Sequence, residues 1–122
     1  MADNFAYEVT GNGLFGVVDL NTGVFTSVGS TGLRLAGLGS YGGVIYAGDD
    51  HGNTLYRVDT STGALTAVGT GNIGNGYALI GSTTSGLYAL GWDDALYSIN
   101  PATGAATETG PTGIPFGTVM GK

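Results

Sequence analysis

Apolar and polar residues alternate along most of the chain, in short runs that Gly, Asn, Asp and Thr interrupt. A period of two is typical of strands with one buried face. No long stretch combines a helical period with freedom from Gly, Pro and β-branched residues, so we expect essentially no helix. In the middle of the chain the alternation predicts four strands, over Leu35–Ser40, Val44–Asp49, Leu55–Asp59 and Ala64–Thr70.

The same four-strand pattern recurs. Its clearest marker is an Asp or Asn that precedes a Thr-Gly pair, with two residues between them. Asp19, Asp59 and Asn100 occupy this position, at spacings of 40 and 41 residues. Asp or Asn can bond a backbone N–H two residues on, and glycine accepts a positive φ, so each marker predicts a tight hairpin turn. Four strands in about 40 residues are typical of a β-propeller blade, whereas a sandwich has no reason to repeat such a unit.

The third unit is divided in the same way as the second. Its alternation predicts strands over Tyr77–Ser82, Leu87–Trp92, Leu96–Asn100 and Ala105–Thr109. In the first unit, aligning Leu14 with Leu55 leaves one extra residue before Asp19, which we interpret as a bulge or as a shift in where the strand starts.

The two ends of the sequence are out of phase with these repeats. Before Leu14 only 4–11 can form a strand, and it aligns with second strands, Phe5-Ala6 lying opposite Tyr46-Ala47. The segment Val119-Met120-Gly121 aligns instead with first strands. We therefore predict one domain, 1–122, holding three four-stranded blades with a circular permutation of one strand. The repeats are 1–32 (completed by 116–122), 33–73 and 74–113.

Three blades do not close a ring, because propellers have about 4–8 of them. Two copies related by a two-fold axis would give six blades. The strand around Met120 would then complete the first blade of its partner, so the sequence predicts a homodimer with reciprocal strand exchange. The alternative is that the chain is a fragment or engineered half of a longer six-bladed propeller.

The repeated pattern resembles that of bacterial β-propeller proteins with Leu-Tyr-x-Val-Asp-x-x-Thr-Gly blades, both quinoprotein-like and glycine-rich ones of unknown function. The nearest match is Leu87-Tyr88-Ala89-Leu90 followed by Asn100-Pro101-Ala102-Thr103-Gly104. The resemblance covers nearly the whole chain and implies blade structure, not chemistry. Quinoprotein blades usually carry Trp after the Thr-Gly turn, where this sequence has Phe25, Leu65 and Ala106, so we expect no quinone and no other cofactor.

Composition narrows the classes of partner. The 122 residues include 25 Gly, only three Lys or Arg against nine Asp or Glu, and no Cys. Three cations cannot neutralise a run of phosphates, so nucleic acid is not an expected partner. No apolar run is long enough to cross a membrane as a helix, and residues 1–5 lack the basic and apolar regions of a signal peptide. We expect a soluble protein and leave its compartment open.

Two loops hold the polar residues that are the best candidates for binding a ligand or an ion. Asp49, Asp50 and His51 could hold a cation, but they lack the order of a calcium loop and are equally typical of a solvated turn, so no metal is expected. Trp92, Asp93 and Asp94 occupy the matching place in the next unit and could stack on and bond a sugar, or Trp92 could pack between blades. Tyr41 and Tyr77 are further candidate ligand-binding aromatic residues.

His51 is the only histidine, and no serine lies in a nucleophile motif, so the protein is not expected to be an enzyme. The favoured interpretation is a non-enzymatic, self-assembling propeller scaffold or binding module whose partner is itself, with a glycan or protein ligand also open. A carbohydrate-binding propeller using the loop aromatic residues and carboxylates is the alternative.

Overall fold

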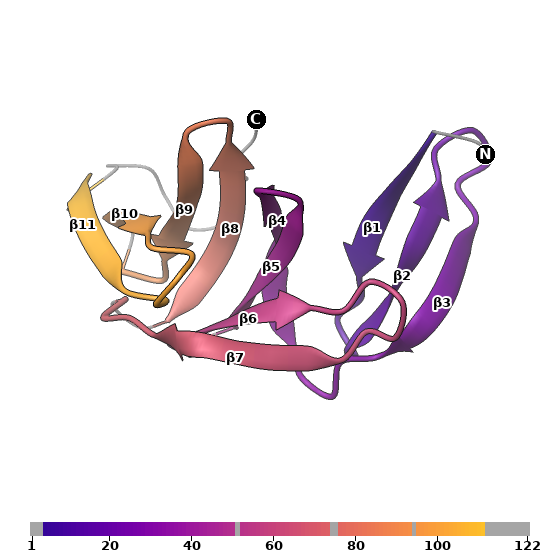
Figure 1. Cartoon of the computed structure of the whole chain (residues 1–122), viewed down its shortest axis with the longest axis horizontal. Helices are drawn as coiled ribbons and strands as arrows, with labels where there is room; N and C mark the ends of the chain where they lie inside the picture. Colours follow the sequence, from indigo (N-terminus) through magenta and orange to yellow (C-terminus); the bar gives the residue numbers. More distant parts are fainter. Residues whose placement is uncertain (1–3, 51, 74–75, 94, 112–122) are drawn as a thin grey trace.

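The computed structural model describes residues 4–50, 52–73, 76–93 and 95–111. These residues form 11 antiparallel strands in three sheets and contain no helix. In Figure 1 the sheets fan out side by side, with the first at the right and the third at the left. The all-β prediction is confirmed, and each sheet is built from strands consecutive in the chain, as in a propeller blade.

The strands of each sheet follow the predicted units closely. The first sheet holds β1 (Phe5–Val9), β2 (Leu14–Asp19) and β3 (Phe25–Ser30). The second holds β4 (Leu35–Tyr41), β5 (Val44–Asp49), β6 (Thr54–Val58) and β7 (Leu65–Thr70). The third holds β8 (Tyr77–Thr83), β9 (Gly86–Gly91), β10 (Ala95–Ile99) and β11 (Ala106–Pro111).

The first sheet has three strands among the described residues, whereas the other two have four. Its order is β1-β2-β3, so β1 occupies the place that the second strand takes in the other sheets. The inner strands β4 and β8 pack against each other, and β1 approaches β4 (Figure 1). The prediction that residues 4–11 form a second strand is confirmed. The strand predicted around Met120 lies outside the described residues.

The hairpin turns have the predicted mechanism in all three sheets. The side chains of Asp19, Asp59 and Asn100 each accept a hydrogen bond from the backbone N–H two residues on, at 2.8–2.9 Å. The glycines that close these turns have φ of 78–80°. The Ser61 hydroxyl and then its backbone N–H donate to Asp59, and these hydrogen bonds hold the pKa of that carboxyl below its usual value.

The strand register corrects two alignments made from the sequence. Phe15, Leu55 and Leu96 pair with Gly29, Gly69 and Gly110, and a bulge follows at the same place each time. Phe15, not Leu14, therefore takes the place of Leu55, and the first unit has no extra residue. Likewise Tyr7, not Phe5, takes the place of Tyr46, since they pair with Val17 and Arg57 at equivalent positions. Both errors arose because the residue types repeat less faithfully than the backbone register.

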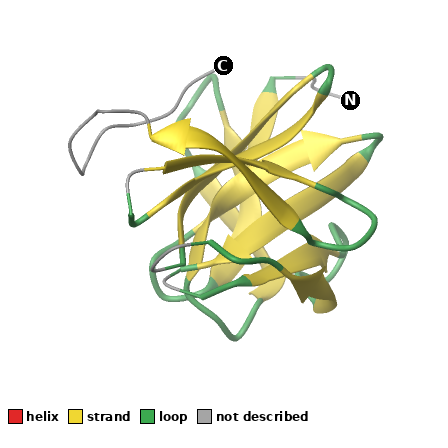
Figure 2. Ribbon diagram, turned by 90° about the vertical axis from the view of Figure 1, so that its left-hand side faces the viewer, coloured by secondary structure: helices red, strands yellow, loops and turns green. Residues whose placement is uncertain are grey.

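The hydrophobic core lies in two layers between neighbouring sheets. Figure 2, seen from the side of the third sheet, shows strands joined by loops. The layer between the first and second sheets contains Phe15, Leu35, Ala47 and Val58. The layer between the second and third sheets is larger and includes Tyr46, Leu55, Tyr77 and Tyr97. Tyr77 lies so close to Gly48 that a Cβ there would stand 2.5 Å from its ring. Within the described part of the chain, no helix could cross a membrane.

Candidate functional site

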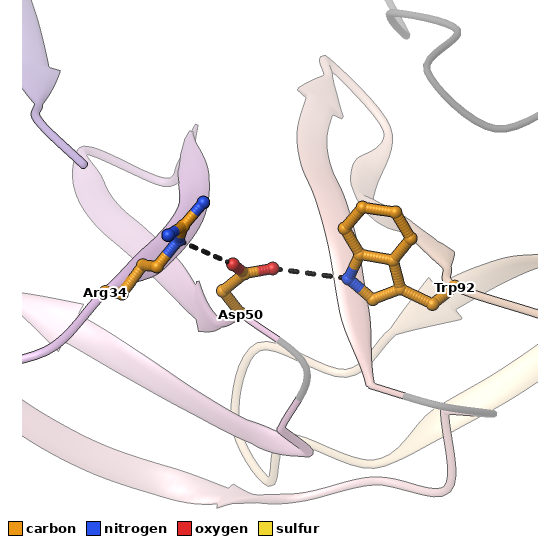
Figure 3. A network of polar contacts seen from close by, with 3 residues as sticks. All are labelled: Arg34, Asp50 and Trp92. Atoms are coloured by element: carbon orange, nitrogen blue, oxygen red, sulfur yellow. Dashed lines mark hydrogen bonds and ion pairs between the residues drawn. The ribbon is translucent and has the colours of Figure 1, made fainter.

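The carboxylate of Asp50 joins the second sheet to the third. One oxygen, Oδ2, lies 2.9 Å from Nε of Arg34, and the other, Oδ1, accepts a hydrogen bond of 3.2 Å from the indole Nε1 of Trp92 (Figure 3). Asp50 is 10% exposed at its side chain and Arg34 is 74% exposed, so solvent weakens the ion pair more than the indole bond. Asp50 and Trp92, two predicted ligand-binding residues, are thus brought together by a contact that fastens two sheets.

Asp93, the next residue of the same loop, is also engaged within its own sheet. It accepts hydrogen bonds from the hydroxyl of Tyr97, at 2.7 Å, and from the backbone N–H of Ala95, at 3.2 Å. These bonds fold the loop between β9 and β10 back on itself. Asp94 and His51, the remaining polar residues of the two predicted loops, lie outside the described residues.

Asp49 ends β5 and lies over Gly52, whose N–H donates to the Asp49 carbonyl at 2.8 Å. Burial, and then the neighbouring negative charge of Asp50, raise the pKa of the Asp49 carboxyl above its usual value. The two acidic side chains therefore repel each other. Among the residues that the structure describes, no three His, Asp or Glu side chains gather into a potential metal site.

The two predicted tyrosines have opposite surroundings. Tyr77 is completely buried between the second and third sheets, where it acts as a core residue out of reach of a surface ligand. Tyr41 lies at the end of β4 and lines a groove of about 540 Å³ together with Tyr46, Val44, Arg57 and Pro101. Among the described residues, the predicted site residues therefore fall into three places: the two acidic loops near Asp50, the groove beside Tyr41, and the core around Tyr77.

Sequence reasoning missed Arg57 and Tyr46 as members of this groove. Arg57 is exposed, and Val17 and Ser98 take its place in the first and third sheets. The signal available in the sequence was this single cation at a repeat position that is otherwise uncharged. Because Tyr46 is mostly buried, the groove offers the ring of Tyr41 together with one positive charge, groups that can stack on a ring and attract an anion.

The fold and its polar contacts define an all-β protein of repeated antiparallel sheets whose two acidic loops have structural roles. No protein-family model matches the sequence, and a search of curated proteins finds no match either. The function must therefore be argued from the geometry of the chain itself.

Replacing Tyr77 by Phe should leave stability unchanged or raise it by about 1 kcal/mol. Within the described residues the Tyr77 hydroxyl is buried without a hydrogen-bond partner, and a buried unpaired polar group costs about 1–3 kcal/mol. Urea denaturation measures the change. The matched control is Tyr97→Phe, which loses the bond to Asp93 and should destabilise the protein. A loss of stability in Tyr77→Phe comparable to that of the control would contradict this assignment.

The Asp49→Asn substitution should stabilise the protein at neutral pH by a fraction of a kcal/mol. The pKa of Asp49 is higher in the folded protein than in the unfolded chain, so the folded protein binds the carboxyl proton more tightly. Stability therefore falls as the pH rises from the unfolded-state pKa through the folded-state pKa. Asn removes this loss, although solvent screening of the part-exposed carboxyl keeps the effect small. Thermal melts from pH 3 to pH 7 should show the variant's advantage vanish at the acidic end; a gain that persists there is the contrary result.

Proposed function

We propose that the protein is a non-enzymatic, self-assembling β-propeller scaffold in which two copies form one six-bladed ring. The observation that carries this proposal is the first sheet, which has three described strands and an inner position beside β1 that no described strand occupies. Three sheets are fewer than any ring of the usual 4–8 blades, and an open arc leaves unpaired strand edges, which proteins normally cover. Two copies supply six sheets, and each copy covers the exposed first and third sheets of the other.

The occupant of the open inner position is the segment 117–122 of the partner copy. Its Val119-Met120-Gly121 aligns with Leu79-Ile80-Gly81, which lies in the inner strand β8 of the third sheet. Tyr7 of β1 and Leu38 and Ile45 of the second sheet line one side of a groove of about 510 Å³ that continues along β8. Apolar side chains from an added strand would fill the space between Tyr7 and Leu38.

The experiment that tests this proposal is the mass of the protein in solution. Native mass spectrometry and light scattering at micromolar concentration should give twice the chain mass of 12.1 kDa. A two-copy ring predicts no stable folded monomer, because each copy provides a strand that the other needs. A compact monomer that survives dilution would refute the ring.

A second candidate function is carbohydrate binding, which the groove beside Tyr41 favours. Tyr41 offers a ring for stacking, and Arg57 offers a positive charge for an acidic sugar. Trp92 and Asp50, two of the other predicted ligand-binding residues, are instead engaged in a hydrogen bond with each other. A glycan array at high protein concentration, repeated with Tyr41→Ala and Arg57→Ala, tests this function. Binding of uronic or sialic acids that both variants lose would support it; an array without signal would remove it.

A further inference from the structure

Neighbouring sheets meet in the same way at both places where the chain brings two of them together. A Cβ atom on Gly29 would collide with the carbonyl oxygen of Thr62, and one on Gly69 with that of Thr103. Both glycines follow the bulge in the outermost strand of their sheet, and both threonines belong to the hairpin turn of the next sheet. The chain thus contains two copies of one joint, a bulge glycine against a Thr-Gly turn.

The third sheet carries the first half of another such joint. Gly110 pairs with Leu96 at the bulge, as Gly29 pairs with Phe15 and Gly69 with Leu55. Phe15 and Leu55 are 0% exposed because the following sheet covers them, whereas Leu96 is only half-buried. The glycine and the apolar residue are therefore in place on the third sheet without a following sheet among the described residues.

The first sheet carries the second half. Its turn glycine, Gly23, is exposed and has no described atom within 4 Å of a Cβ built on it, whereas Gly63 and Gly104 are buried against the preceding sheet. Leu20 and Val24 flank this turn and are 58% and 59% exposed. Pro101 and Ala105, their counterparts in the third sheet, line grooves against the second sheet, and the second sheet has the exposed Thr60 and Ala64 at these positions. The first sheet therefore carries larger apolar side chains at these two positions than the internal joints do.

The outer face of the first sheet agrees with this assignment. Val18 is partly exposed and pairs with Phe25, whereas Val58 and Ile99, at the same repeat position, are buried by the preceding sheet. One residue departs from the pattern. Glu8 is exposed on this face, where the second sheet has the buried Ala47, so this joint would include a carboxylate that the internal joints lack.

We propose that the third sheet of one copy docks on the first sheet of a second copy, with Gly110 against the Thr22–Gly23 turn and with Leu20 and Val24 at the edge of the contact. The partner is a second copy because the same chain carries both halves of the joint in the register of its internal joints. This inference rests on the two-copy ring, where two such joints form, and it assigns the surfaces that the ring uses. It concerns the sheet faces, not the exchanged strand.

The test compares Gly110→Val with Gly11→Ala, a glycine that has open space around it. A valine side chain at position 110 would collide with the partner's turn, so the dimer dissociation constant should rise about a hundredfold or more, since both joints carry the change. Gly11→Ala should remain dimeric like the parent. The fluorescence of Trp92, which lies between the second and third sheets, reports whether each variant is folded.

A mixing experiment separates a broken joint from a misfolded chain. Leu20→Asp with Val24→Asp should also prevent dimerisation, from the other side of the joint. When this double variant is mixed with Gly110→Val, one joint of the mixed dimer contains both defects and the other is intact. Native mass spectrometry should therefore detect mixed dimers in excess of either variant's own dimer.

A parent dimer that Gly110→Val leaves as tight as before would overturn the joint while leaving self-assembly standing. Variants that form neither mixed dimers nor β structure when they are combined would overturn it as well. A monomeric parent would refute the proposed ring and this inference together, so the two failures are distinguishable.

Discussion

Removing residues 117–122 should unfold the protein or drive it to aggregate. In the proposed ring, this deletion would take one inner strand from each of two blades and expose the edge of β1. Each lost backbone hydrogen bond is worth about 0.5–1.5 kcal/mol net, and burial of Val119 and Met120 about 1.5–3 kcal/mol each. Their sum approaches the whole stability of a small protein, about 5–15 kcal/mol.

Circular dichroism, urea denaturation and light scattering measure this effect together. The matched control removes Lys122 alone, which should leave both stability and mass unchanged. A truncated chain that stays a soluble dimer with an unshifted denaturation midpoint would show that this segment is only a tether.

The Gly69→Ala substitution should destabilise the protein by about 3 kcal/mol or more. The added Cβ would collide with the carbonyl oxygen of Thr103, and a backbone atom in a hairpin turn cannot move aside as a flexible side chain can. For a chain of this size the thermal midpoint should fall by roughly 10 °C or more.

The control for this prediction is Gly86→Ala, in β9, where a Cβ would meet only Cε2 of Tyr88 at 4.0 Å. That variant should be neutral or slightly stabilised, because alanine restricts the unfolded chain. Equal losses of stability in the two variants would mean that the cost arises from strand glycines in general and not from the contact between sheets.

The local structure could be predicted from the sequence because its causes are local. Alternation located β4 to β11 to within one or two residues, and the Asp/Asn-x-x-Thr-Gly marker predicted both the side-chain hydrogen bond and the positive φ of each turn. Counting strands per repeat also predicted that 4–111 would supply only three strands to the first sheet, as the described residues do. These features depend on residues close together in the chain.

Contacts between sheets could not be predicted in the same way. Asp50 and Trp92 are 42 residues apart, and nothing in either loop indicates that an indole will donate to that carboxylate. Tyr77 and Tyr41 look alike as strand-end aromatic residues, but one fills the core and the other lines a groove. Their difference depends on how two sheets stack, which single-strand patterns do not encode.

The mass of the folded protein in solution tests the central claim most directly. Native mass spectrometry across a dilution series should show a dimer of twice the 12.1-kDa chain, with loss of β structure whenever it dissociates. A folded monomer of 12.1 kDa, with its circular dichroism spectrum unchanged on dilution, would contradict the two-copy ring.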